Sequence, residues 1–153
     1  MEVTILIEHG AEKLEGLPLR ELCCFAMEYM QCPPNTELSL SFVTNEKIHE
    51  LNRDYRGIDR PTDVLSFECD NLPFEGEDFD DSELFELGDT IIATDVCEAQ
   101  RAEYGTSFEG EVTLLIVHSI LHLLGYDHVV EEEAEEMEAL EDKIIAAWNE
   151  QRA

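Results

Sequence analysis

The chain has 153 residues, 44% of them hydrophobic, which is typical of one folded domain over residues 1–153 and not of a disordered segment. No stretch approaches the roughly 18 consecutive apolar residues that a membrane helix needs. The first ten residues also lack the basic and apolar regions of a signal peptide. We therefore expect a cytoplasmic protein with no membrane partner.

The charge is strongly negative, with nine basic residues against thirty-seven acidic ones and a formal net charge of −28. Because nucleic-acid-binding proteins usually present a basic surface, this composition taken alone argues against DNA or RNA. Acidic residues gather at 68–86 and 131–141, where we expect solvated faces, including an irregular acidic loop at about 69–86. Three arginines lie within eight positions of one another and allow a local basic site: Arg53, Arg56 and Arg60.

The first third of the chain predicts two strands and two helices. Apolar and polar residues alternate at 3–7 and at 38–43, as in half-buried strands. Between them, apolar residues at three- and four-residue spacing predict a helix over 18–30. Thr44-Asn45 can cap a short helix that carries Ile48 and Leu51.

The rest of the chain predicts two more strands, at 64–67 and 87–93, the latter interrupted at Gly88-Asp89. Three helices follow, at about 95–104 with a cap from Thr94 or Asp95, at 108–124 and at 131–148. About four strands and five helices without regular alternation predict an α+β fold with one small mixed sheet.

The five cysteines do not suggest a disulfide framework, because their number is odd and no C-x-x-C pair occurs. Cys23 and Cys97 lie among apolar neighbours and are predicted to be small core residues.

Three of the five histidines fall within eleven positions, in His118-Ser-Ile-Leu-His122-Leu-Leu-Gly-Tyr-Asp-His128. On a helix, His118 and His122 are rotated by only about 40° from each other, so one metal ion can bind both. Gly125 can end the helix and let the chain bring His128 to the same ion. Three imidazoles leave the fourth position of tetrahedral zinc to water, which is the pattern of a catalytic site on this helix and the turn that follows it.

The spacing of these histidines and of Gly125 matches the H-E-x-x-H-x-x-G-x-x-H zinc proteases. In those enzymes the glutamate directly after the first histidine is the general base. Ser119 occupies that position here and has no carboxylate, so a peptidase of that type is disfavoured.

Zinc can also generate hydroxide and polarise a phosphoryl oxygen, which suits phosphodiester hydrolysis. Such a reaction needs a cation for the phosphate, and Arg56 in Tyr55-Arg56-Gly57 is the best candidate because guanidinium binds phosphate in a bidentate manner. A surface salt bridge is an equally good interpretation of Arg56 from its position alone.

The sequence resembles the YbeY family of bacterial ribosomal RNA maturation factors, which are metal-dependent endoribonucleases specific for single strands. The resemblance rests on the histidine motif, similar to H-G-x-L-H-L-x-G-Y-D-H, and on three further stretches. These are Leu51 to Gly57 running on through Pro61 to Phe67, Gly88 to Ile92, and the Glu-Glu-Met-Glu-Ala-Leu run at 135–140. Ser119 departs from the family, which usually has glycine there, and we expect this small residue to be tolerated.

The resemblance implies one Zn²⁺ ion held by His118, His122 and His128, and a role for Arg56 in RNA cleavage through contact with the RNA phosphate. It implies action in 3′-end maturation of 16S ribosomal RNA and in ribosome quality control. The general base is left open, and three carboxylates in or beside the matched stretches are candidates: Asp63, Asp89 and Asp127. Each can equally cap or turn the chain, and Asp127 can instead orient a ligand imidazole.

Two other functions fit the sequence less well. One is a ribosome assembly factor without catalytic activity whose zinc only stabilises the fold, and the other is a zinc-dependent amide hydrolase. For either ribosomal role, the acidic faces could bind the ribosome or basic small-subunit proteins, which would deliver RNA to a chain that repels it in bulk.

Overall fold

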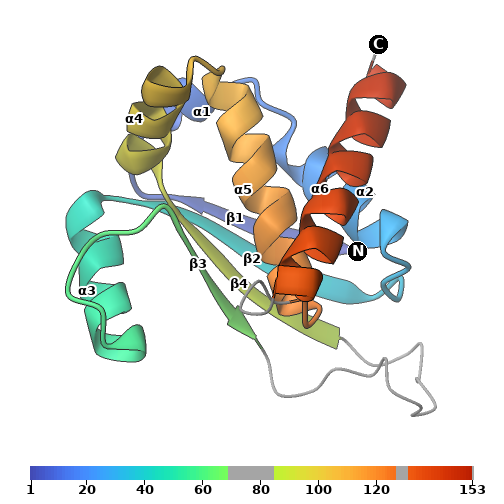
Figure 1. Cartoon of the computed structure of the whole chain (residues 1–153), viewed down its shortest axis with the longest axis horizontal. Coiled ribbons are helices and arrows are strands. Elements are labelled where there is room, and N and C mark those ends of the chain that lie inside the picture. Colours follow the sequence, from blue (N-terminus) through green and yellow to red (C-terminus); the bar gives the residue numbers. More distant parts are fainter. Residues whose placement is uncertain (69–84, 127–130, 153) are drawn as a thin grey trace.

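The computed structural model describes residues 1–68, 85–126 and 131–152 (Figure 1). Ten elements follow one another along the chain: β1 (Glu2–Ile7), α1 (Ala11–Leu14), α2 (Leu19–Tyr29), β2 (Thr36–Val43), α3 (Asn45–Arg56), β3 (Val64–Glu68), β4 (Phe85–Ala93), α4 (Thr94–Tyr104), α5 (Phe108–Leu123) and α6 (Glu131–Arg152).

The strands form one sheet in the order β1-β2-β4-β3. β1 and β4 both run parallel to β2, and β3 is antiparallel to β4. The four expected strands and the mixed sheet are thus confirmed, and so is the α+β class. Between the parallel strands β2 and β4 the chain forms α3 and then β3. β3 lies at the sheet edge beside β4 and antiparallel to it.

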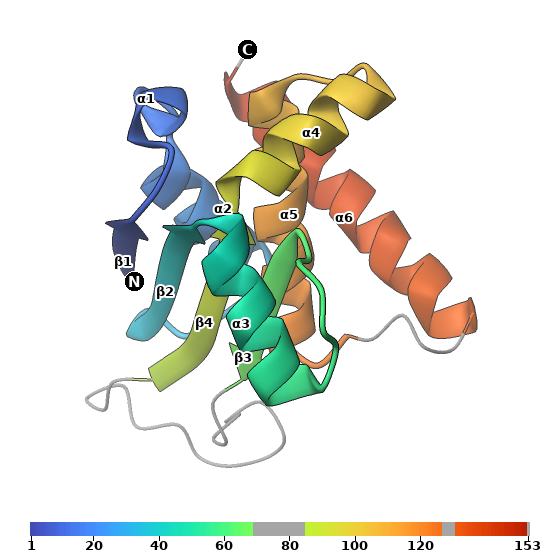
Figure 2. The same ribbon diagram turned by 90° about the vertical axis from the view of Figure 1, so that its left-hand side faces the viewer.

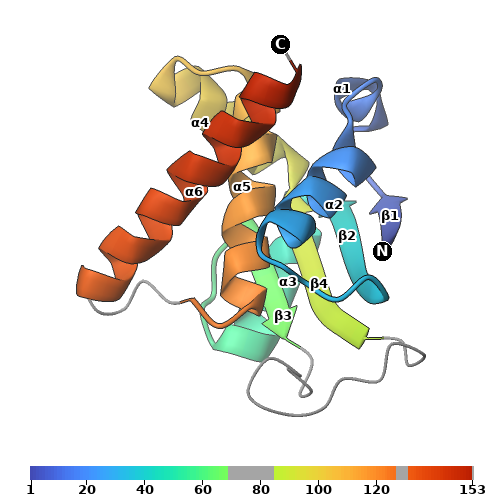
Figure 3. The same ribbon diagram turned by 90° about the vertical axis from the view of Figure 1, so that its right-hand side faces the viewer.

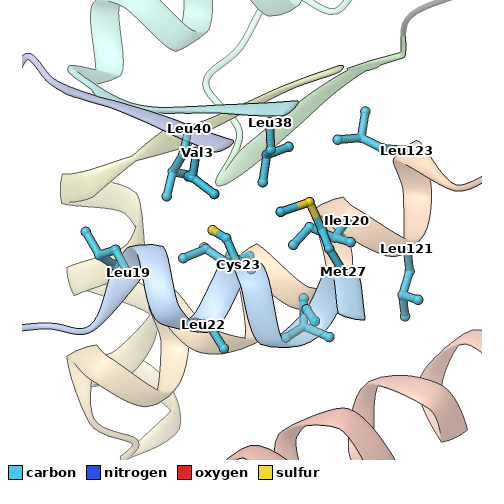
Figure 4. Close-up of a cluster of buried hydrophobic side chains, with 14 of the residues drawn as sticks. Val3, Leu19, Leu22, Cys23, Met27, Leu38, Leu40, Ile120, Leu121 and Leu123 are labelled. Atoms are coloured by element: carbon cyan, nitrogen blue, oxygen red, sulfur yellow. The ribbon is translucent and has the colours of Figure 1, made fainter. Parts of the chain in front are cut away.

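The helices cover the two faces of the sheet unequally. α5 lies across one face between α2 and α6 (Figure 3), whereas α3 covers the opposite face (Figure 2). The larger core is between the sheet and α5, α2 and α6. Its buried side chains include Leu38 and Leu40 of β2, Cys23 and Met27 of α2, and Ile120 of α5 (Figure 4).

A smaller apolar cluster lies under α3, where Ile48 packs against Val43 and Leu65. It fixes α3 against the β3 and β4 edge of the sheet. This anchors the end of α3 and the connection to β3 beside the C-terminal half of α5.

The structure adds one short helix, lengthens another, confirms one helix cap and corrects a second. α1 was not predicted, because a single helical turn is too short to show periodicity. The expected short helix with Ile48 and Leu51 is α3, which continues to Arg56 and ends where Gly57 adopts a left-handed conformation with φ of 70°. Thr44 caps α3 as expected, by accepting from the Lys47 amide at 3.2 Å. The expected cap of α4 at Thr94 is wrong, because its hydroxyl instead donates to the His9 carbonyl at 2.9 Å.

Gly88 explains the interruption expected in the fourth strand. β4 continues through it, but the register against β2 shifts between Glu37 and Leu38. Gly88 has a φ of 148°, and a β-carbon there would lie 2.3 Å from the Phe67 carbonyl oxygen. The bulge and the close approach of β3 therefore require glycine at this position.

Cys23 and Cys97 are fully buried, as predicted, and the four cysteines in the described ranges are free thiols. Burial raises the pKa of Cys23 and of Cys97 to about 12. None of the helices in the described part of the chain is long and apolar enough to cross a membrane.

Candidate active site

A cavity of about 500 Å³ opens where the end of α3, the α3–β3 connection, β3 and α5 meet. α3 contributes Asn52 and Arg56, and α5 contributes His118 and His122. The other lining residues come from the connection and from β3: Ile58, Arg60, Thr62, Asp63, Val64, Leu65 and Ser66. The cavity therefore unites the histidine motif with the conspicuous Tyr-Arg-Gly stretch, which lies some sixty positions earlier in the chain.

His118 and His122 lie one turn apart on α5, on the same side of the helix. Their rings pack edge to face with centroids 4.9 Å apart and an interplanar angle of 74°. The helical placement predicted for these two residues is confirmed. Gly125 has a φ of 99° directly after the helix, as expected for a residue that ends it. His128 lies outside the described residues.

A carboxylate from α6 supports the first histidine of the pair. Nδ1 of His118 donates a hydrogen bond to Oε1 of Glu141, a residue that is only 7% exposed. Sequence reasoning missed Glu141, because it ends an acidic run and looks like another solvated charge. The signal was its spacing: Met137, Glu141, Ile144 and Trp148 form the buried stripe of α6, so this one glutamate faces the core.

Ser119 faces the sheet and is completely buried. Its hydroxyl lies 2.6 Å from that of Ser66 on β3 and 2.7 Å from that of Thr90 on β4. One O–H can donate to one neighbour while the oxygen accepts from the other. Ser119 thus ties α5 to two strands next to the histidines.

Of the three clustered arginines, Arg56 and Arg60 line the cavity and Arg53 does not. Arg53 donates to Asp54 at 3.0 Å, and this hydrogen bond raises the pKa of Arg53. Neither Arg56 nor Arg60 forms an ion pair within residues 1–68, 85–126 and 131–152. For this part of the chain, the salt-bridge interpretation of Arg56 therefore finds no support.

Asn52 braces the segment that carries these two arginines. It is 1% exposed, and its Nδ2 donates to the Arg60 carbonyl at 2.9 Å. The Ile58 amide also donates to the Asn52 carbonyl at 3.2 Å. Sequence reasoning did not single out Asn52, because a polar residue at the end of a predicted helix usually faces solvent.

The three candidate carboxylates for a general base differ in position. Asp63 lines the cavity, but its Oδ1 accepts from the Val64 amide at 2.8 Å and its Oδ2 accepts from Gln100 at 3.3 Å. Asp89 is exposed on β4 and alternates with Thr90, so it faces away from α5 and does not line the cavity. Asp127 lies outside the described residues. Asp63 is therefore the better-placed candidate of the two that are described.

The described residues supply only part of a transition-metal site. No group of three His, Cys, Asp or Glu side chains there is arranged to hold a metal ion. The two imidazoles of α5 are nevertheless ligands that zinc prefers, they share one cavity, and one of them has a carboxylate behind it. These features fit zinc, with the third predicted ligand at His128.

Known proteins match this chain over most of its length. A family model described as "Endoribonuclease YbeY" matches residues 9–149. A protein of that name from Clostridioides difficile is 46% identical over 94% of this chain and 90% of its own length. Proteins of the same name from Halalkalibacterium halodurans and Brevibacillus brevis are 47% and 51% identical, over 94% and 91% of this chain and 93% and 89% of theirs.

Among solved structures, the solution structure of a Thermotoga maritima protein is similar to this chain throughout. The TM-score is 0.59 at 26% sequence identity, with 97% of this chain and 93% of the other covered. The fold described above is therefore shared over most of both chains.

Proposed function

The chain belongs to the YbeY family of endoribonucleases and is therefore a hydrolase of RNA phosphodiester bonds, and we propose that it uses one zinc ion to cut single-stranded ribosomal RNA. Its cellular task in this proposal is 3′-end maturation of 16S ribosomal RNA and quality control of ribosomes, in the cytoplasm. The proposed zinc ligands are His118, His122 and His128.

One observation carries the proposal: the cavity has two imidazoles on its α5 wall and two arginines on its α3 side. Imidazoles are metal donors, and guanidinium groups bind phosphate oxygens with two parallel hydrogen bonds. A phosphodiester can use both, because the arginines can bind its oxygens and a metal can activate water for attack at phosphorus. Bound zinc would supply Lewis acidity and an activated water molecule.

The residues of the chain divide the remaining work. Arg56 and Arg60 would bind the negatively charged oxygens of the scissile phosphate. Asn52 keeps the segment that carries them in place. His118 and His122 set the position of the metal from a helix that is tied to the sheet through Ser119. Asp63 is the proposed general base at the cavity wall.

The test combines metal analysis with RNA cleavage. Purified protein is expected to contain about one zinc per chain and to cut a single-stranded RNA from the 3′ end of the 16S precursor, but not the same sequence as a duplex. A chelator should abolish cutting, and added zinc should restore it. Persistent cutting in metal-free protein would refute the metal dependence, and equal cutting of both RNAs would refute the strand specificity.

The two alternatives predict other outcomes. For an assembly factor with a structural zinc, His118→Ala would unfold the protein or leave ribosome maturation intact. For an amide hydrolase, a peptide library would be turned over. Ser119 disfavours that activity because it supplies no carboxylate next to His118.

The acidic surface is part of the proposal, as a docking site for basic small-subunit proteins. All acidic residues of α6 except Glu141 are exposed, and the other acidic run, 69–84 in particular, lies outside the described residues. Replacing three exposed glutamates of α6 by glutamine, at positions 132, 135 and 138, should weaken association with the small subunit. Unchanged association would refute docking through this face.

A further inference from the structure

Glu141 is a buried acid in a helix whose other acids are all exposed. Its helix neighbours on the same stripe are Met137, Ile144 and Trp148, which pack in the main core. Removing a carboxylate from water is costly unless strong hydrogen bonds replace the lost hydration. The burial of Glu141 therefore needs an explanation, whereas the exposed acids of the helix need none.

The partner of Glu141 is His118, which lies 23 residues earlier on α5 and lines the cavity. A carboxylate oxygen accepts, so the Nδ1 atom of the imidazole donates. In the neutral ring the proton then resides on Nδ1, and the lone pair is on Nε2 at the opposite edge. Nε2 is consequently the atom that would bind a metal in the cavity.

We propose that Glu141 is a positioning residue that sets the tautomer and orientation of His118 for metal binding. Carboxylates behind ligating imidazoles raise the basicity of the ligand and fix the ring in this way. The inference rests on the proposed metal site and extends it to α6, an element that contributes no residue to the cavity lining. It makes the contact between α5 and α6 part of the site as well as part of the core.

The test measures zinc affinity in Glu141→Gln and Glu141→Leu. Glutamine keeps the shape and removes the charge, and leucine matches the apolar stripe around it. Glu138→Gln is the matched control, because Glu138 is an exposed glutamate three residues earlier on the same helix. Competition with a chromogenic chelator should show zinc binding about 10- to 100-fold weaker in both Glu141 variants and unchanged in the control.

A purely structural role gives a different result: the thermal midpoint of the metal-free variants falls while the zinc affinity of the folded protein stays within twofold of the original. That outcome overturns the proposal. A second measurement needs no variant. Nitrogen-15 shifts of the His118 ring in metal-free protein should report the Nδ1–H tautomer, and the Nε2–H tautomer would refute the inference.

Failure of the inference and failure of the proposed function are distinguishable. If the unmodified chain binds no zinc, the metal site itself is wrong. If the unmodified chain binds zinc and Glu141→Gln binds it equally well, the metal site stands and the role of Glu141 is wrong.

Discussion

The hydroxyl cluster next to the histidines can be tested by changing Ser119 to alanine or to glycine. Ser119→Ala removes one buried oxygen and no carbon. Ser66 and Thr90 each lose their hydrogen-bond partner on α5. Ser119→Gly loses the same two contacts and also removes the β-carbon.

The magnitude follows from the two contacts, at 2.6 and 2.7 Å. A net contribution of about 0.5–1.5 kcal/mol for each bond gives a loss of about 1–3 kcal/mol. Alanine is the better helix former by about 0.5 kcal/mol, which offsets part of the loss in Ser119→Ala. Glycine is less favourable than alanine in a helix by about 1 kcal/mol, so Ser119→Gly should be the least stable of the three proteins.

Urea and thermal unfolding measure the effect. For a chain of this size, 1 kcal/mol corresponds to a change in midpoint of about 2–4 °C. The expected order of stability is serine, alanine, glycine, with alanine lower than serine by about 1.5 kcal/mol. The double variant Ser66→Ala/Ser119→Ala should lose less than the sum of the single variants, because both remove the same contact. An alanine variant as stable as the original chain would refute the argument that the cluster stabilises the packing of α5.

Three further predictions concern the phosphate contact, the metal and the thiols. Arg56→Ala should lower the rate of single-stranded RNA cleavage by about 10²-fold or more without changing the thermal midpoint, whereas Arg53→Ala, whose side chain pairs with Asp54, should leave the rate unchanged. Zinc at about 100 times its dissociation constant should stabilise the chain by about 2.7 kcal/mol in unfolding assays, and His122→Ala should remove that gain. Burial raises the pKa of Cys23 to about 12 in the folded protein, so the contribution of this thiol to stability is complete below the ordinary thiol pKa and is lost as the pH rises toward 12. The fall in the free energy of unfolding between pH 9 and 11 should therefore be smaller in Cys23→Ala than in the original chain. An equal fall would contradict the raised pKa.

The strands and most helices could be predicted from the sequence because each has its own periodicity and its own end signals. The apolar alternation at 38–43 and the three- and four-residue spacing around Cys23 and Met27 are local properties of the chain. The order of the strands is not local. Nothing within β3 indicates that it lies antiparallel at the edge beside β4. That pairing depends on how α3 packs on the sheet and where the α3–β3 connection returns the chain to it.

The candidate site divides in the same way. His118 and His122 were predictable because four-residue spacing on a helix fixes their relative direction. The meeting of Arg56 with these histidines depends on the packing of α3 against the sheet, and from the residues alone it was one of two equal interpretations of Arg56. Glu141 and Asn52 were missed because their roles depend on burial, and each resembles an ordinary surface residue in the printed sequence.

The strong negative charge of the chain does not exclude an RNA substrate, because the cavity has cations of its own. Arg56 and Arg60 line the cavity at the end of α3 and in the α3–β3 connection, whereas the exposed acids of α6 belong to a helix that contributes no residue to that lining. At physiological ionic strength, charges separated by more than about 8 Å are largely screened when both are exposed to solvent. A phosphate bound in the cavity would therefore lie beside the two arginines, and we expect the net charge of the chain to act mainly on the approach of RNA. In this arrangement the acidic surface would affect how RNA approaches the chain, and the cavity would be the place where it is cleaved.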